Sequence, residues 1–175
     1  MAEETGTPPS LDQIADQMAI HEVLNLHSRG LDRLDKGTIL SAYWPEAEVD
    51  YGSFKGSAHL FAELVVAALG ETYELTRHSL TNTLFHFSGP TARCESSVKA
   101  GHLLLGAEEE LLFYGRYLDK LEKRDKQWKM INRQVVMDWS KRFPVRDERN
   151  NEAFVDLQKG AHLGSDPLYP FLNEK

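Results

Sequence analysis

Cysteine is nearly absent from this chain, because Cys94 is the only one among 175 residues. A single thiol cannot form an intrachain disulfide, and it cannot supply the several thiolates of a structural zinc site. Long apolar runs are missing too, since none approaches the roughly 20 residues that span a membrane. These absences exclude a disulfide-stapled domain, a zinc finger and a helical membrane protein.

Basic residues are the minority of the charges, with 20 Lys and Arg against 27 Asp and Glu and a net charge of −7. That balance argues against nucleic acid or an anionic membrane as a partner, because both select a basic surface. The 7 prolines and 12 glycines are too few for a collagen-like or disordered chain. Residues 1–10 are polar and acidic, unlike a signal peptide, so we expect a flexible leader and a cytoplasmic protein.

The chain is long enough for one domain, which at this length buries about 70% of its unfolded surface and needs no covalent staple. Ser10 and Gln13 form a capping-box pattern before an apolar stripe of helical period. We expect Pro45 to end a second, short helix and Gly70 to cap a third. The predicted helices cover 11–34, 38–44 and 57–69.

Beyond residue 70 the chain becomes rich in Thr, Tyr, Phe and Leu, as is typical of strands. The predicted strands cover 72–88, 91–106, 109–124 and 127–140, after a short strand and turn within 47–56. Helices first and meandering strands later indicate an α+β domain over 11–143 with one strongly curved antiparallel sheet. The remainder, 144–175, has weak periodicity, and we expect it to pack on the domain or on a partner subunit.

Several short sequence patterns follow one another in a fixed order within about residues 11–140 and in the tail. They are the segment Ile20 to Asp35, Y-W-P-E-A-E-V-D-Y-G after it, R-H-x-x-x-N from Arg77, G-R-Y-x-D-x-x-x-x-R-D from Gly115, W-K-M-I-N-R and D-W between Trp128 and Trp139, and G-x-x-x-x-S-D-P-x-Y from Gly160. Together they resemble the SnoaL-like branch of the nuclear-transport-factor-2-like superfamily.

This resemblance implies a cone-shaped, cystatin-like α+β barrel, in which the sheet wraps around a pocket closed by the N-terminal helices. It also implies a dimer or trimer. It does not imply one reaction, because the branch includes dehydratases, dehydrochlorinases, isomerases, cyclases, formaldehyde lyases and non-catalytic binders. The chain has no Walker loop, no G-x-G-x-x-G and no histidine spacing typical of a metal site, so we expect neither cofactor nor metal.

Asp32 and His78 match the Asp and His of the catalytic dyad in the family's dehydratases. A neutral histidine can take a proton, and a carboxylate on its other nitrogen fixes the tautomer and stabilises the imidazolium. The structural alternatives are a histidine bonded to backbone, and a helix-end carboxylate paired with Arg29 or Arg33. We interpret the nearby Asp35 as a capping or turn residue.

Two further candidates would act on the substrate oxygen or leaving group. His102, on the next strand, matches a second polar residue of the dehydratases and would be a second acid; a shift of one residue in register would instead place it on the outer face. Tyr51 can donate its hydroxyl to a substrate oxygen. Its alternative is an aromatic lid packed on the first helix.

Three candidate binding residues complete the predicted site. His27 stands where the dehydratases often keep a tyrosine, about 140° around the helix from Asp32, so it would enter the pocket obliquely, as an imidazolium acid. Arg133 would hold an anionic oxygen in the cavity, or else form a surface salt bridge with Asp119. Asn82, four residues after His78, is either a pocket donor or a cross-strand partner.

These residues predict a cofactor-independent lyase for a small, ring-bearing, hydroxylated substrate. His78, assisted by Asp32, would remove a proton, and water or formaldehyde would leave. The alternatives are an isomerase with the same pocket and a non-catalytic small-molecule binding domain. The apolar runs Leu103–Leu105 and Leu111–Phe113 exceed what one concave face can bury, so we expect a homodimer or homotrimer through the outer sheet face.

Overall fold

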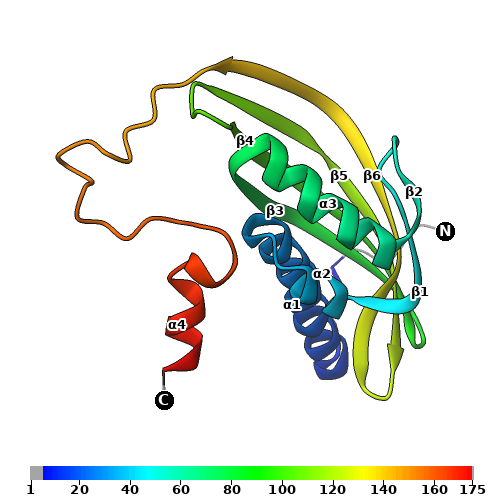
Figure 1. Ribbon diagram of the computed structural model, residues 1–175. Helices are drawn as coiled ribbons and strands as arrows, with labels where there is room; N and C mark the ends of the chain where they lie inside the picture. Colours follow the sequence, from blue (N-terminus) through cyan, green and yellow to red (C-terminus); the bar gives the residue numbers. More distant parts are fainter. Residues whose placement is uncertain (1–5, 175) are drawn as a thin grey trace.

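Residues 6–174 are described by the computed structural model, in which helices cover the concave side of one curved six-stranded sheet (Figure 1). The elements are α1 (Leu11–Arg33), α2 (Lys36–Ser41), β1 (Tyr43–Asp50), β2 (Lys55–Ser57), α3 (Ala58–Thr72), β3 (Tyr73–Ser88), β4 (Thr91–Leu104), β5 (Glu109–Arg124), β6 (Gln127–Pro144), the 3₁₀ helix η1 (Leu163–Ser165) and α4 (Leu168–Asn173). The predicted α+β class is confirmed. Of the predicted leader, residues 1–5 lie outside the described range, and 6–10 are exposed. None of the helices in this range is long and apolar enough to cross a bilayer.

Helix α1 begins where the capping-box pattern predicts. The Ser10 hydroxyl accepts a hydrogen bond from the Gln13 backbone N–H at 3.2 Å, and the Gln13 side chain accepts one from the Ser10 N–H at 2.9 Å. These bonds satisfy donors that the start of a helix leaves open. The helix ends at Arg33, and the residue that caps its C-terminus, Leu34, has a φ of 53°. Asp35 then caps α2, as predicted, by accepting from the Thr38 N–H at 2.9 Å.

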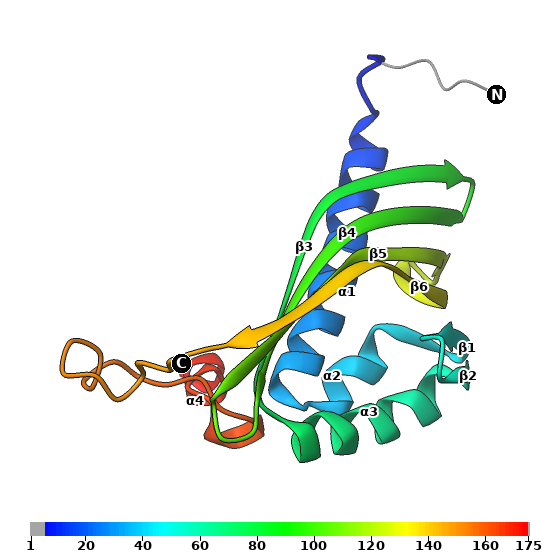
Figure 2. The same ribbon diagram turned by 90° about the horizontal axis from the view of Figure 1, so that it is seen from above.

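The strand order across the sheet is β2-β1-β6-β5-β4-β3. Strands β3 to β6 form the predicted antiparallel meander. Strand β1 joins the far side parallel to β6, and β2 pairs antiparallel with β1. Strand β6 runs past the predicted residue 140 to Pro144. Figure 2 shows the long strands curving around α1, which gives the sheet a concave inner face.

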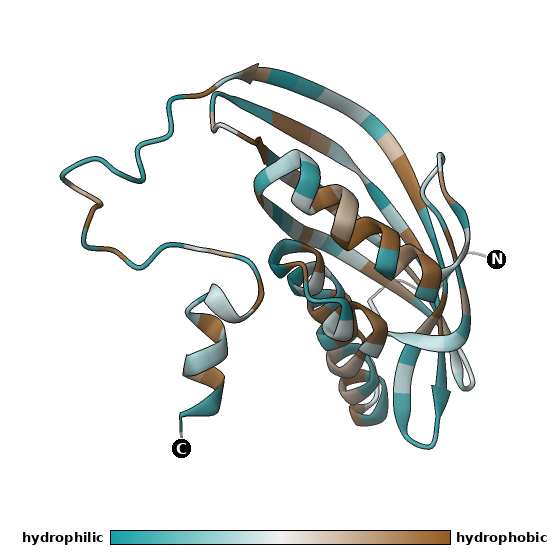
Figure 3. Cartoon of the chain, viewed as in Figure 1, coloured by the Kyte–Doolittle hydropathy of each residue, from teal (hydrophilic) through white to brown (hydrophobic). Residues whose placement is uncertain are grey.

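The hydrophobic core lies between this inner face and the helices. Ile20 and Leu24 of α1 are at most 1% exposed and belong to the same cluster as Leu121 and Met130 from the sheet. Figure 3 shows hydrophobic residues on α1 and α3, which lie against the sheet, and both hydrophobic and hydrophilic stretches along β5 and β6. Burying one such side chain contributes about 1.5–3 kcal/mol. This packing fixes α1, and the polar groups that it carries, against the sheet.

Two predicted helix ends are wrong. Pro45 does not end a helix, because α2 ends at Ser41 and Pro45 lies inside β1. The missing N–H of proline is tolerated there, since the β1–β6 pairing is irregular between Tyr43 and Glu48. Gly70 lies within α3 and does not cap it. A Cβ at Gly70 would lie 3.2 Å from Leu34 Cδ1, so this glycine permits the close approach of α3 to the end of α1.

The tail after β6 leaves the sheet and returns to the helices. In Figure 1 the chain swings outward before α4 comes back towards α1 and α2. Arg33 Nε lies 3.0 Å from an Asp166 carboxylate oxygen, and the Tyr169 hydroxyl donates to Asp35 at 2.9 Å. Asp166 is buried and accepts two further backbone N–H groups of its own segment. The tail segment with the G-x-x-x-x-S-D-P-x-Y pattern, which starts at Gly160, is therefore bound to the α1–α2 turn of its own chain.

Candidate active site

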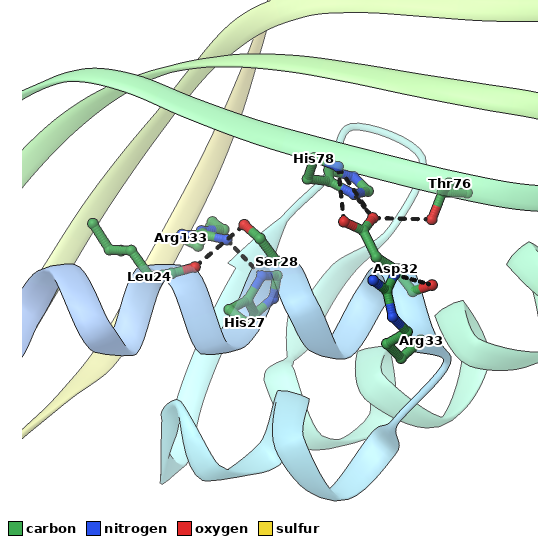
Figure 4. Close-up of polar contacts among 8 residues, drawn as sticks. All are labelled: Leu24, His27, Ser28, Asp32, Arg33, Thr76, His78 and Arg133. Carbon is green, nitrogen blue, oxygen red and sulfur yellow. Dashed lines mark hydrogen bonds and ion pairs between the residues drawn. The ribbon is translucent and has the colours of Figure 1, made fainter. Parts of the chain in front are cut away.

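Asp32 projects from the last turn of α1 onto β3, where its carboxylate is fully engaged (Figure 4). It accepts hydrogen bonds from the Thr76 hydroxyl at 3.1 Å and from the His78 backbone N–H at 2.9 Å. The His78 ring nitrogen Nδ1 lies 2.6 Å from the same carboxylate. The predicted proximity of Asp32 and His78 is therefore present, and the Thr76 bond fixes the carboxylate that orients the ring.

The contact with Asp32 determines which nitrogen of His78 is available. A carboxylate accepts, so Nδ1 carries the hydrogen and donates it to Asp32. In the neutral ring the other nitrogen, Nε2, holds a lone pair, and it has no hydrogen bond to any residue in the described range. The His78 and Asp32 side chains are only 7% and 11% exposed, so bulk water screens their interaction weakly. This arrangement can accept a proton at Nε2 and stabilise the resulting imidazolium.

His102 lies beside His78 on the inner side of the sheet. The two rings meet edge to face with centroids 5.6 Å apart, and Tyr73 lies 4.8 Å away on the ring of His102. Its Nδ1 is buried without a hydrogen-bond partner in the described chain. Burial, followed by the proximity of His78, lowers the pKa of His102 to about 4. The ring is thus neutral near pH 7, which disagrees with a role as a second acid but permits N–H donation.

A second polar group is completely buried in the interior. Arg133 is 0% exposed and donates from Nε at 2.7 Å and Nη2 at 2.8 Å to the two carboxylate oxygens of Asp119. Its Nη1 lies 2.8 Å from His27 Nδ1, and His27 Nε2 lies 3.0 Å from the Tyr43 hydroxyl. The guanidinium also lies 4.1 Å from the centre of the Tyr117 ring. Burial removes water from the Arg133 guanidinium, and the ion pair with Asp119 offsets this cost. An unpaired buried cation would have no such compensation.

These contacts correct two expectations. His27 was expected to act as an imidazolium, but both of its ring nitrogens are occupied by protein groups. Burial, then Arg133 and then His78, hold the pKa of His27 well below its ordinary value, so the ring is neutral. Arg133 does pair with Asp119, as one alternative had it, but in the core and not at the surface.

Tyr51 also belongs to this interior group. Its ring stacks on Phe61 with centroids 4.1 Å apart and an interplanar angle of 21°. Its hydroxyl is buried and makes no hydrogen bond of standard geometry with a described residue. Burial raises the pKa of Tyr51, while the neighbouring Arg133 and Tyr43 lower it. The phenol therefore keeps its proton and has a hydrogen to donate.

The sequence pattern of the SnoaL-like domain matches residues 12–134, the part of the chain that contains the dyad and the buried polar group. The chain belongs to the SnoaL-like family. It is 27% identical over 133 residues to hexachlorocyclohexane dehydrochlorinase 1 of Sphingobium indicum, an alignment that covers 74% of this chain and 86% of that protein.

Solved structures share the fold of this SnoaL-like chain within the nuclear-transport-factor-2-like superfamily. A scytalone dehydratase candidate from Novosphingobium aromaticivorans superposes with a TM-score of 0.69 at 24% identity, over 77% of this chain and 91% of that one. A Nostoc punctiforme protein of unknown function with a cystatin-like fold gives 0.58 at 18% identity, over 71% and 92%. The predicted cystatin-like architecture is confirmed.

Asn82 is the one predicted site residue that the SnoaL-like fold places outside the interior. It is exposed and has a φ of 50°, at an interruption of the β3–β4 pairing between Thr81 and Leu84. The four-residue spacing from His78 predicts a shared face only along a regular strand. The bulge breaks that alternation, so Asn82 does not join the dyad.

A pocket of about 710 Å³ opens beside the dyad. Asp32, Thr76 and His78 contribute to its lining, together with residues 145–148 and Gly160 of the tail. The interior group around Arg133 does not line it. A ligand in this pocket therefore meets the dyad between the tail and β3.

Sequence reasoning missed Thr76 and Tyr43. Thr76 lies two residues before His78, and this strand spacing alone indicates a shared face. Tyr43 starts the Y-W-P-E segment, but nothing local to it indicates a bond to His27. Within residues 6–174, no three His, Cys, Asp or Glu side chains are grouped to bind a metal ion.

Proposed function

We propose that this SnoaL-like chain is a lyase that works without a cofactor, eliminating a small neutral molecule from a ring-bearing, hydroxylated substrate. The observation that carries the proposal is the 2.6 Å contact between His78 Nδ1 and Asp32, which leaves Nε2 as the proton acceptor. The names of two similar proteins, a dehydrochlorinase and a scytalone dehydratase candidate, both denote eliminations.

In the proposed reaction His78 Nε2 takes a proton from the carbon next to the one that bears the leaving hydroxyl. The C–H electron pair forms the new double bond, and the C–O bond breaks. His102 is neutral and burial raises the pKa of Tyr51, so neither readily supplies the proton that the hydroxyl needs. His78 therefore returns its proton to the departing oxygen, giving an alkene and water. If the hydroxyl of a hydroxymethyl substituent is deprotonated instead, its O–H electron pair forms the C=O bond of formaldehyde. The electron pair of the broken C–C bond forms the double bond, and the neighbouring hydroxyl leaves as water with the proton that His78 returns.

The test is a screen of hydroxylated aromatic and polycyclic compounds for a new ultraviolet chromophore, with mass spectrometry to detect loss of water or formaldehyde. We expect folded His78→Ala to lose about 10²–10⁴-fold in turnover, the usual contribution of a general base. Asp32→Asn should be comparably impaired, because an amide donates to Nδ1 and shifts the hydrogen to Nε2. The matched control is His21→Ala, which removes an exposed histidine from the same helix.

The double variant of Asp32 and His78 should be little worse than either single one, since the two act as a unit. Circular dichroism must show an intact fold in each. Turnover at the wild-type rate in folded His78→Ala would remove the dyad from the mechanism. A product of unchanged mass would identify isomerisation, in which the proton returns to another carbon.

A further inference from the structure

The tail of the chain, residues 145–169, lies beside the dyad although it is outside the residues 12–134 that match the family pattern. Its first part, 145–148, and Gly160 contribute to the lining of the pocket beside the dyad. Figure 1 shows that the chain between these two places swings away from the sheet, and that α4 then comes back towards α1 and α2. The tail therefore meets the domain at the pocket and again at the helices.

Asp166 is the charged residue that attaches the second part of the tail. Its side chain is only 5% exposed, and its Oδ2 accepts from the Ala161 backbone N–H at 2.9 Å and lies 3.0 Å from Arg33 Nε. Its Oδ1 accepts from the Leu168 backbone N–H at 3.0 Å. Burial alone would raise the pKa of Asp166, but the two N–H donors and Arg33 lower it, so the carboxylate is ionised. A buried carboxylate needs partners of this kind.

Arg33 connects this carboxylate to the dyad. It follows Asp32 directly in the last turn of α1, and Figure 4 shows its side chain beside the Asp32 backbone. Arg33 Nη1 donates to the Asp32 carbonyl at 3.4 Å, and a carbonyl in the last turn of a helix has no partner within the helix. The tail holds this turn a second time, because the Tyr169 hydroxyl donates to Asp35. Both contacts act on the few residues that determine where Asp32 points.

We infer that Asp166 and Arg33 are positioning residues of the active site, which hold the turn that carries Asp32 so that its carboxylate stays aligned with His78 Nδ1. This inference rests on the proposed lyase function, since the alignment matters only if His78 is the base. The bonds from Thr76 and His78 join the carboxylate to β3 alone. The tail fixes the helix turn on the other side, so both partners of the contact are held.

The ion pair can be removed while Asp166 keeps its two backbone N–H bonds, by Arg33→Gln. On whichever substrate the screen supplies, this variant should lower kcat about three- to tenfold with little change in KM. That is less than the roughly 10²-fold cost of a 1 Å misplacement, because Thr76 still bonds Asp32. Arg33→Lys keeps a cation and should recover part of the loss. The matched control, Asp156→Asn, removes an exposed carboxylate from the same tail and should have no effect.

A double-mutant cycle tests whether the two residues act together. Asp166→Asn removes the charge that faces Arg33. If the ion pair is the link to the dyad, Asp166→Asn should lower kcat less in the Arg33→Gln background than in the wild type. An equal loss in both backgrounds would refute the ion pair as the link.

The Nδ1–H signal of His78 gives a readout that needs no substrate. It is recorded in ¹⁵N–¹H spectra of the protein labelled on histidine and is assigned by its loss in His78→Ala. In Arg33→Gln this hydrogen should exchange with water about two- to tenfold faster, the value of one hydrogen-bonded contact. The ring signals of His27, assigned in His27→Gln, are the internal control, because His27 is completely buried on the same helix. They should not change.

An unchanged exchange rate of His78 in Arg33→Gln would overturn the inference. An equal change in His27 would indicate that α1 loosens as a whole and would also count against it. A higher KM with unchanged kcat would show that the tail only lines the pocket, and would refute the positioning role.

The two proposals fail separately. If His78→Ala retains full activity while Arg33→Gln speeds the exchange of His78, the lyase mechanism is wrong and the contact from the tail to the dyad stands. If the dyad variants lose activity while Arg33→Gln changes neither kcat nor the exchange, only the positioning role is wrong.

Discussion

The stability of this protein should depend on pH through His102, because burial lowers its pKa from an ordinary 6.5 to about 4. Well above pH 6.5 the ring is neutral in both the folded and unfolded states, so it does not change the free energy of unfolding. As the pH falls from 6.5 towards 4, the unfolded chain binds a proton that the folded chain does not. The free energy of unfolding therefore falls over this interval and levels off below it.

The size of the effect follows from the two pKa values. Between pH 7.5 and pH 5 the unfolded chain should gain about 2 kcal/mol relative to the folded one from this ring alone, at 1.36 kcal/mol per pH unit. His102→Leu and His102→Asn both remove the titrating ring, one leaving an apolar and the other a polar side chain. Each variant should therefore lose about 2 kcal/mol less than the wild type over the same pH change.

The measurement is urea denaturation followed by circular dichroism at pH 7.5 and pH 5. His27 is buried in the same way in wild type and variants, so its contribution to the pH dependence of stability cancels in the difference. Only the change of that difference with pH is diagnostic, because the substitutions alter packing at both pH values. If the wild type and both variants lose equal stability on acidification, His102 is not buried as described.

Two further predictions concern the buried ion pair and the assembly. Asp119→Ala should destabilise the fold by about 3–5 kcal/mol in urea denaturation, because it leaves the Arg133 guanidinium buried and unpaired. The double variant Asp119→Leu with Arg133→Met should recover most of this loss. A cost below about 1 kcal/mol in the single variant would contradict the pairing. We also propose that the chain forms a homodimer or homotrimer through the outer sheet face, where Trp139 is 57% exposed and stacks on Tyr114 at 4.8 Å. Trp139→Lys should then shift sedimentation towards the monomer, and a wild type that is monomeric at micromolar concentration would count against the proposal.

Local hydrogen bonds and the composition and periodicity of each segment, which the sequence alone contains, determined much of this fold. The start of α1 depends on two hydrogen bonds between Ser10 and Gln13, three residues apart, and the α1–α2 turn depends on Asp35 in the same way. The long strands follow from a composition rich in Thr, Tyr, Phe and Leu that each segment carries by itself. Asp32 and His78 were identified because their sequence patterns resemble those of a known family, and the structure places them 2.6 Å apart.

Tertiary structure alone decided the states of the polar side chains. The buried pair of Arg133 with Asp119, and its contact with His27 on another element, join residues that are far apart in the chain. The pKa of His102 depends on burial by neighbours that no sequence spacing specifies. Asn82 does not lie on the inner face, because a bulge interrupts the alternation of side chains along β3. A sequence contains the period of each element, but protonation, hydrogen-bond direction and burial depend on what the other elements bring into contact.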